Sequence, residues 1–349
     1  MNQAGATRAY TREQVWLPAS EGLLDWGEDF HDLMLGDELR MKAFHAAVRE
    51  AVQPGSVVLD LGTGTGILAQ WALEAGAARV YGIDLNEAVL DTARRRIAAA
   101  GHADRFHPLA GLSFDLELPE RVDLVISEIM GNLADNENFG AILADAGRRF
   151  LAEGGAMLPS RVESYLVPVS APHAHAQIRD GAPHDAGGRE RFAGLLRGRG
   201  APSPFDLYYD AVLPLSGYLA APRVARVYDF GQLSGEGDGN YRVPLVWTAR
   251  RDDVLTGFKG YFTATLSPTV ALDISADDIE GRTTSDSWKH CYLPVRDPVP
   301  VHRGDRVALL FSRTAPDPAD GAFRQVYRWQ GRVVSSTGTV TGRFDHSTG

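Results

Sequence analysis

The chain has 349 residues, a formal net charge of −10, 44% hydrophobic and 23% charged residues, and a single cysteine. That length is enough for two domains, each with its own core, and one cysteine excludes an internal disulfide framework. The acidic balance argues against nucleic acid as the main partner, and no apolar run approaches the roughly 18 residues needed to span a bilayer. The N-terminus lacks the layout of a signal peptide. We therefore expect a globular cytoplasmic protein without a membrane partner, beginning with a flexible segment over residues 1–27.

Residues 28–159 alternate between helical and strand patterns. Apolar residues at helical spacing predict helix over 30–52, with a break near Gly36. A strand over 57–61, a glycine-rich turn and a helix over 67–75 then form the opening unit of a nucleotide-binding α/β domain. The pattern also predicts helices at 86–99 and 139–151 and strands at 79–83, 105–108, 122–126 and 154–159.

The glycine-rich turn decides between classes of nucleotide. Ile67 stands where the dinucleotide fingerprint would need its third glycine. The spacing of Gly62, Gly64 and Gly66, preceded by Asp60, instead resembles class I S-adenosylmethionine-dependent methyltransferases. An NAD enzyme and a purely structural turn remain the alternatives at this point.

The loop after the strand at 122–126 carries two glutamates, Glu128 and Glu137, on either side of Gly131. In an open α/β sheet, ligands bind at the carboxyl ends of the strands, where this loop begins. Two carboxylates at one site repel each other unless a cation lies between them. The sequence therefore predicts a cationic ligand here.

The pattern changes near Pro159. Residues 160–349 carry short alternating strands separated by turns, which is typical of an all-β domain, and we expect a barrel or a sandwich. Residues 171–204 interrupt the strands with one helical stretch at 189–196, and we interpret them as an inserted arm used for self-association. We expect the tail after Thr341 to be loose.

Three separated motifs resemble the protein arginine methyltransferase family. They are Ser127-Glu128-x-Met130-Gly131 with Glu137, the segment from His31 to Arg40, and Ser285-Asp286-Ser287-Trp288-Lys289. The resemblance implies a Rossmann-like class I methyltransferase domain followed by a β-barrel domain with an inserted arm. It also implies a homodimer or a larger homo-oligomer.

The resemblance implies a role for each matching residue. Glu128 and Glu137 would clamp the guanidinium of the acceptor, and Arg40 would pair with the methionyl carboxylate of S-adenosylmethionine. The other implied cofactor-binding residues are His31, Asp60, Gly62, Gly64, Asp84 on the ribose and Asp115 on the adenine side. The implied substrate-binding residues are Met34, Asp37, Ser287 and Trp288.

The chemistry of a guanidinium agrees with two carboxylates. Because its pKa lies above about 12, removing its proton at neutral pH is costly. A pair of carboxylates can instead hold the group through charge-assisted hydrogen bonds and leave one nitrogen directed at the methyl group. This chemistry needs no metal.

The segment between the glutamates departs from the family, which has aromatic residues there. This chain has Asn132, Ala134, Asp135 and Asn136. We expect Asp135 and Asn136 to meet an α-amino or α-carboxyl group, which favours free L-arginine or a small arginine-like metabolite as acceptor, with monomethylation. The alternatives are a protein arginine N-methyltransferase and an inactive methyltransferase-like scaffold.

Overall fold

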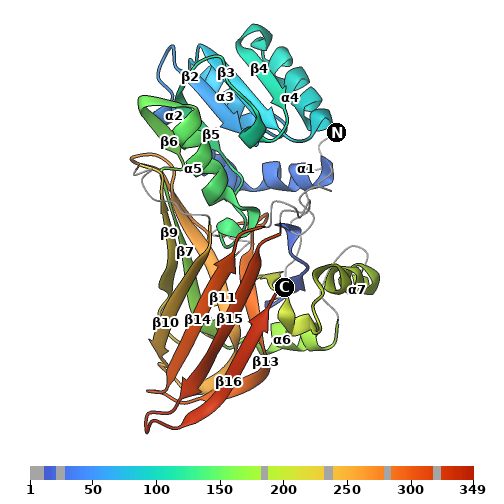
Figure 1. The fold of residues 1–349 in the computed structure, drawn as a ribbon, viewed down its shortest axis with the longest axis vertical. Coiled ribbons are helices and arrows are strands. Elements are labelled where there is room, and N and C mark those ends of the chain that lie inside the picture. The colour runs from blue at the N-terminus through green and yellow to red at the C-terminus, as the bar shows by residue number, and fades with distance from the viewer. Residues whose placement is uncertain (1–11, 21–27, 182–187, 232–238, 279–283, 317–323) are drawn as a thin grey trace.

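The computed structural model describes residues 12–20, 28–181, 188–231, 239–278, 284–316 and 324–349 (Figure 1). The chain passes from an α/β domain into a domain of antiparallel strands, which confirms the predicted order. Within the described ranges, no helix combines the length and the apolar character that crossing a membrane requires.

The first domain is built on a parallel sheet with the strand order β4-β3-β2-β5-β6. Its strands are β2 (Val57–Leu61), β3 (Arg79–Asp84), β4 (Phe106–Ala110), β5 (Val122–Ser127) and β6 (Leu151–Leu158). The central strands are almost entirely buried, as expected for a parallel sheet with helices on both faces. Each strand overlaps a predicted one, but β6 begins earlier than the sequence pattern indicates.

The helices of this domain begin and end at recognisable signals. They are α1 (Glu28–Gly36), α2 (Glu38–Ala51), α3 (Ile67–Glu74), α4 (Glu87–Ala99) and α5 (Phe139–Arg149). The predicted break near Gly36 is confirmed, because α1 ends there and the Asp37 side chain caps α2 by accepting a hydrogen bond from the Arg40 N–H (3.2 Å). Asn86 caps α4 in the same way.

A buried carboxylate holds the turn between β2 and α3. One oxygen of Asp60 accepts hydrogen bonds from the Thr63 hydroxyl (2.6 Å) and the Ala69 N–H (3.0 Å). Burial raises the pKa of Asp60 to about 7, and the charge of Asp84 adds to the effect, whereas the two hydrogen bonds oppose it. Asp60 therefore fixes the glycine-rich turn onto the first turn of α3.

The second domain consists of two antiparallel sheets whose inner faces share one hydrophobic cluster. The larger sheet has the order β1-β8-β13-β11-β7-β9, with β12 paired to β11, and the smaller sheet has the order β10-β14-β15-β16. The larger sheet comprises β1 (Val15–Trp16), β7 (Arg161–Val169), β8 (Tyr209–Ala211), β9 (Arg223–Asp229), β11 (Asp253–Thr265), β12 (Ala271–Asp273) and β13 (His290–Val301). The smaller sheet comprises β10 (Tyr241–Thr248), β14 (Arg306–Thr314), β15 (Val326–Val334) and β16 (Val340–Ser347). In the described part of the chain the two sheets do not close into one ring, so the domain is barrel-like.

The expectations for the two ends of the chain need correction where the structure describes them. Val15 pairs with Ala211 and Trp16 with Asp210, so these two residues belong to the larger sheet and not to a flexible segment. Residues 1–11 and 21–27 lie outside the described ranges. The expected loose tail is the strand β16, whose Phe344 is buried in the core. Both strands are short or sparsely apolar, and only their partner strands make them regular.

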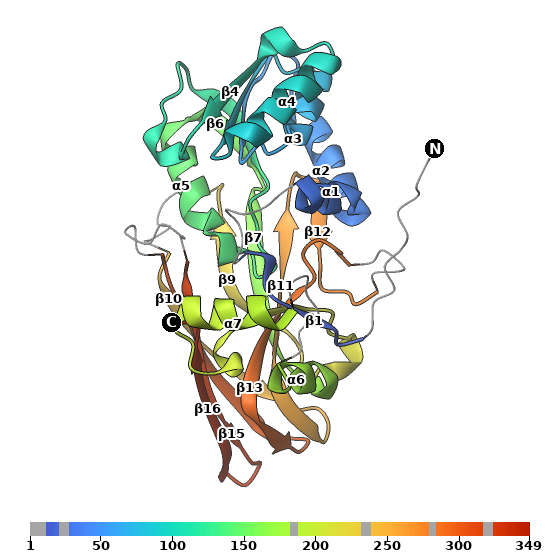
Figure 2. The same cartoon turned by 90° about the vertical axis from the view of Figure 1, so that its right-hand side faces the viewer.

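The region predicted as an arm contains two helices, α6 (Pro172–Arg179) and α7 (Gly188–Arg199). The sequence predicts only the second, because α6 is polar and begins with Pro172, which also suits a loop. Ile178 and Phe192 belong to a cluster with Val167 and Tyr209 of the larger sheet. Figure 2 shows both helices on the same side of this domain, close to β1.

The hydrophobic core continues across the boundary between the domains. The Phe139 ring at the start of α5 packs edge-on against Tyr228 of β9, with 4.8 Å between centroids. On the other side, the Glu50 carboxylate of α2 accepts hydrogen bonds from the hydroxyls of Ser267 (2.7 Å) and Thr269 (2.6 Å). The site at this boundary is therefore held by both domains.

We expect Asp60→Asn to change how stability depends on pH. The folded state binds the Asp60 proton more tightly than the unfolded chain does, so raising the pH from about 4 to 7 removes stability on the order of a few kcal/mol. Asparagine can accept the same hydrogen bonds and does not titrate. The free energy of unfolding, measured with urea at a series of pH values, should fall less between about pH 4 and 7 in the variant than in the wild type. The same pH dependence of the unfolding free energy in both proteins would contradict this explanation.

Candidate active site

A cavity of about 590 Å³ opens above the glycine-rich turn of the first domain. The predicted residues Gly62, Gly64 and Asp84 line it at the carboxyl ends of β2 and β3. Met34 and Arg40 line it from α1 and α2. The structure therefore brings together most of the residues assigned to the cofactor, at the edge of the sheet where α/β proteins bind ligands.

The turn needs its glycines for steric reasons. Gly62 has φ of +74°, and a Cβ atom there would lie 2.5 Å from Cγ2 of Ile129. The Gly64 N–H donates a 2.8 Å hydrogen bond to Asp84, whose other oxygen accepts from the Asn86 N–H (2.9 Å). Asp84 is thereby held beside the cavity, and the backbone of the turn stays open to a ligand.

Three of the predicted cofactor residues need separate comment. The buried Asp60 does not line the cavity and supports the turn from beneath. Asp115 was a wrong choice for a direct contact, because the 3-10 helix η3 (Ser113–Asp115) leaves it exposed, whereas its neighbours Ser113 and Phe114 line the cavity. The side chain of His31 lies outside the described part of the structure, although its backbone belongs to α1.

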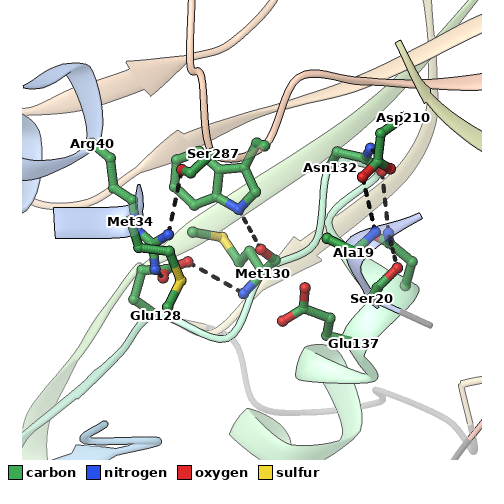
Figure 3. Close-up of a pocket in the computed structure, with 12 residues that line it drawn as sticks. Ala19, Ser20, Met34, Arg40, Glu128, Met130, Asn132, Glu137, Asp210 and Ser287 are labelled. Atoms are coloured by element: carbon green, nitrogen blue, oxygen red, sulfur yellow. Dashed lines mark hydrogen bonds and ion pairs between the residues drawn. The ribbon is translucent and has the colours of Figure 1, made fainter. Parts of the chain in front are cut away.

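A second, much smaller cavity of about 30 Å³ lies on the other side of Arg40 (Figure 3). Four side chains line both cavities: Met34, Arg40, Glu128 and Glu137. The loop from Glu128 to Glu137, the double-glutamate loop, therefore forms with Met34 and Arg40 the wall that the two cavities share.

Arg40 supplies a cation to one of the two glutamates, Glu128. Its guanidinium forms an ion pair with Glu128 and lies over the Trp288 ring, 4.8 Å from the ring centroid. Burial lowers the pKa of Arg40 to about 10, while the carboxylates of Asp37 and Glu137 oppose the shift. Arg40 therefore remains charged at neutral pH.

The late motif of the second domain packs directly against Arg40. Asp37 accepts hydrogen bonds from the Ser287 N–H (3.0 Å) and hydroxyl (2.8 Å), and from the Ser285 hydroxyl. The Ser287 hydroxyl is also 3.5 Å from a guanidinium nitrogen of Arg40. The indole N–H of Trp288 donates a hydrogen bond to the Met130 carbonyl (2.5 Å). Asp37, Ser287 and Trp288 thus lie together, as the resemblance implies, but they support Arg40 and the loop.

Glu137 differs from Glu128 in having no fixed partner. Its carboxylate makes no hydrogen bond or ion pair with any residue that the structure describes, and none is drawn in Figure 3. Burial raises the pKa of Glu137 to about 7, Arg40 opposes the shift, and the carboxylate of Asp210 adds to it. An incoming cation would therefore find Glu137 available and would favour its ionised form.

Asp135 was assigned to the substrate, and the structure contradicts this. Its carboxylate is 1% exposed and accepts hydrogen bonds from the hydroxyls of Tyr228 (2.6 Å), Tyr241 (2.7 Å) and Tyr327. Arg313 forms an ion pair with it across 3.6 Å. All four partners belong to the second domain, whose arrangement around the loop the sequence could not show.

Asn136 lines the small cavity, but its polar atoms are also engaged. Its amide donates to the Ser20 hydroxyl (3.1 Å) and to the Asn132 carbonyl (3.1 Å). Asn132 in turn donates to Asp210 (2.7 Å), which also accepts from the Ala19 N–H (2.9 Å). Sequence reasoning missed Ser20 and Asp210 because both lie outside the recognised motifs.

Comparisons with known proteins agree with this arrangement. Residues 58–155 match the family described as "Methyltransferase domain", and residues 161–329 match the family described as "PRMT5 oligomerisation domain". Protein arginine N-methyltransferase PRMT10 of Oryza sativa subsp. japonica is 38% identical over 149 residues. That match covers 42% of this chain and 39% of the relative's length.

Longer matches cover both domains at lower identity. Probable protein arginine N-methyltransferase 1.2 of Arabidopsis thaliana is 24% identical over 307 residues, which cover 86% of this chain and 81% of the relative. The crystal structure of Arabidopsis thaliana protein arginine methyltransferase 10 superposes with a TM-score of 0.74 at 20% identity, covering 91% of this chain and 96% of that one. The matched domains follow the predicted order, and the motif residues gather at one site, so the chain is similar to protein arginine methyltransferases over both domains.

Proposed function

We propose that this protein transfers a methyl group from S-adenosylmethionine to a guanidino nitrogen of an arginine side chain in a protein. The observation that carries the proposal is the meeting of the two cavities at Met34, Arg40, Glu128 and Glu137. The methyl donor would bind in the large cavity and the guanidinium in the small one. The four side chains that line both cavities would align the methyl group with the accepting nitrogen.

The large cavity has the chemistry that the cofactor requires. The open backbone of the turn at Gly62 and Gly64 suits close approach of the nucleoside, and the Asp84 carboxylate suits its ribose hydroxyls. Leu85 and Phe114, each about half exposed at the cavity, offer apolar contact to a flat base. The bound cofactor supplies an electrophilic methyl group on a sulfonium centre.

In this proposal Arg40 binds two carboxylates, that of the cofactor and that of Glu128. The resemblance assigns it to the methionyl carboxylate, and in the structure it pairs with Glu128. A guanidinium has several donors in one plane and can hold both carboxylates at the boundary of the two cavities. Asp37 and Ser287 orient it for this task from α2 and the second domain.

The two glutamates act on the acceptor. Glu137, which has no fixed partner, would receive the guanidinium, and Glu128 would hold it from the opposite end of the loop. Two carboxylates on one planar cation localise its positive charge and leave one terminal nitrogen directed at the methyl group. The pKa of Glu137, raised to about 7 by burial, falls again when the cation binds.

A protein side chain is better supported as acceptor than free L-arginine. The case for a small molecule depended on Asp135 and Asn136, and both are engaged by other residues of the chain. The relatives named above are protein arginine methyltransferases. Monomethylation has no support of its own in the geometry.

We also infer that the protein self-associates. The support is the match of residues 161–329 to an oligomerisation domain, together with the helices α6 and α7 on one side of the barrel-like domain. Sedimentation equilibrium measures this directly, and a chain that stays monomeric at micromolar concentration would exclude it.

Glu137→Gln should nearly abolish methyl transfer and leave cofactor binding close to normal. The amide keeps the size of the side chain but cannot balance the charge of a guanidinium. Turnover is measured with labelled cofactor, and binding of S-adenosylhomocysteine by calorimetry. Loss of binding in the variant would mean that Glu137 serves the cofactor. Cofactor binding by the wild type without transfer to any guanidine would instead favour an inactive scaffold.

An Arg/Gly-rich peptide should be methylated, and free L-arginine should not be methylated at comparable concentration. The reason is that Asp135 and Asn136, the residues expected to bind an α-amino or α-carboxyl group, are engaged by other residues of the chain. Mass spectrometry of both acceptors after incubation with labelled cofactor decides the matter. Transfer to free arginine alone would overturn the protein-acceptor proposal.

A further inference from the structure

The Asp135 carboxylate connects the catalytic loop to the second domain. Tyr228 of β9 and Tyr241 of β10 donate to one of its oxygens (2.6 and 2.7 Å), and Tyr327 of β15 donates to the other. Arg313 of β14 forms an ion pair with the same carboxylate (3.6 Å). Four strands that lie far from the loop in the sequence therefore converge on one of its residues.

Arg313 also holds the residues on both sides of Glu137. One of its terminal nitrogens donates to the Asp135 carbonyl (3.2 Å) and to the Asn138 side-chain oxygen (2.9 Å). Its other terminal nitrogen donates to the Gly239 carbonyl (2.7 Å). The short 3-10 helix η4 (Asp135–Glu137) and the following residue are thus clamped by a single guanidinium.

These contacts are costly to break. Asp135 and Arg313 are each about 2% exposed in their side chains, and the hydroxyl of Tyr327 is fully buried beside them. Burial, and after it the Asp135 carboxylate, raises the pKa of Tyr228, Tyr241 and Tyr327 far above the usual value. Each hydroxyl therefore stays protonated and donates a hydrogen bond to Asp135. Loss of the carboxylate would leave buried donors without an acceptor.

Glu137 needs this support more than Glu128 does. Glu128 is held by its ion pair with Arg40 and accepts a hydrogen bond from the Met130 N–H (3.4 Å). The Glu137 carboxylate has neither kind of contact among the residues described, so no polar contact among those residues holds it in place other than through its backbone. That backbone is the segment that Asp135 and Arg313 hold.

We infer that Asp135 is a positioning residue for catalysis: it anchors η4 to the second domain and thereby sets the place of Glu137 in the acceptor cavity. The inference rests on the proposed function. It gives the second domain a part in the reaction beyond self-association, because four of its strands fix one end of the guanidinium clamp.

Asp135→Asn tests this inference. The amide cannot accept all of the hydrogen bonds or balance Arg313, so η4 should shift. A misplacement of about 1 Å in a catalytic group can cost on the order of 10²-fold in rate, and we expect a loss of kcat of that order with an arginine-containing peptide. The Kd for S-adenosylhomocysteine should stay within about twofold of the wild type, because Asp135 does not line the large cavity.

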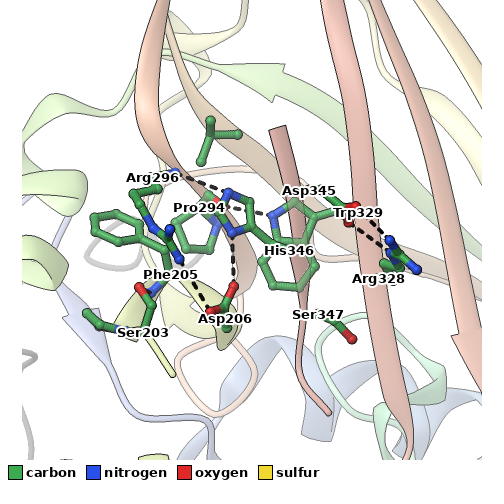
Figure 4. A network of polar contacts seen from close by, with 12 residues as sticks. Ser203, Phe205, Asp206, Pro294, Arg296, Arg328, Trp329, Asp345, His346 and Ser347 are labelled. Carbon is green, nitrogen blue, oxygen red and sulfur yellow. Dashed lines mark hydrogen bonds and ion pairs between the residues drawn. The ribbon is translucent and has the colours of Figure 1, made fainter. Parts of the chain in front are cut away.

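Asp206→Asn is the matched control, because Asp206 is also a buried carboxylate of a polar network (Figure 4). It lies in the 3-10 helix η5 (Pro204–Asp206) and accepts from the His346 ring (3.0 Å) and from Arg296 (3.5 Å). Both partners belong to the second domain, away from the catalytic loop. This variant should lower the unfolding temperature and keep kcat close to that of the wild type.

The outcome depends on comparing the two variants at equal folded fraction. A kcat for Asp135→Asn within about twofold of that for Asp206→Asn would overturn the inference. If Asp135→Asn does not fold, Tyr241→Phe removes one hydroxyl and keeps the ring, and a several-fold loss of kcat with unchanged cofactor Kd is then expected. An unchanged kcat in that variant would also overturn it. Activity in Glu137→Gln would instead refute the proposed function, so the two failures are distinguishable.

Discussion

Buried carboxylates that need cations determine the architecture of this site. Glu128 is balanced by Arg40, and Asp135 by Arg313 with three tyrosine hydroxyls. Ionised groups withdrawn from water are tolerated only when such partners are in place. Glu137 is the exception among the described contacts of the loop, and burial raises the pKa of its carboxyl. A site that lacks one cation is suited to bind one, which connects the electrostatics of the fold to arginine recognition.

The same requirement explains why the catalytic machinery belongs to both domains. The first domain supplies the turn, the cavity above it and the loop with the two glutamates. The second domain supplies Ser287 and Trp288 beside Arg40, and the strands around Asp135. The core is continuous through Phe139 and Tyr228 at the same boundary. Neither domain alone would hold the wall between the two cavities.

Features set by local sequence could be predicted well. The strand, glycine-rich turn and helix from 57 to 75 follow from hydrophobic pattern and backbone freedom, and the helix break is explained by the capping side chain of Asp37. Predictions failed where a distant partner decides the outcome. Asp135 looked like a substrate ligand until the strands around it were known. The tail strand β16 is regular only because it pairs with β15.

The sequence by itself predicted the resemblance to a family, the order of the domains and several of the residues that line the two cavities, because these depend on short motifs and on local periodicity. Only the tertiary structure decided which of those residues face the cavity and which face the second domain. The reason is that neighbouring residues of an irregular loop point in different directions, and their partners lie far along the chain. Asp135 and Glu137 are two residues apart, yet Asp135 is bonded to the second domain and Glu137 lines the cavity.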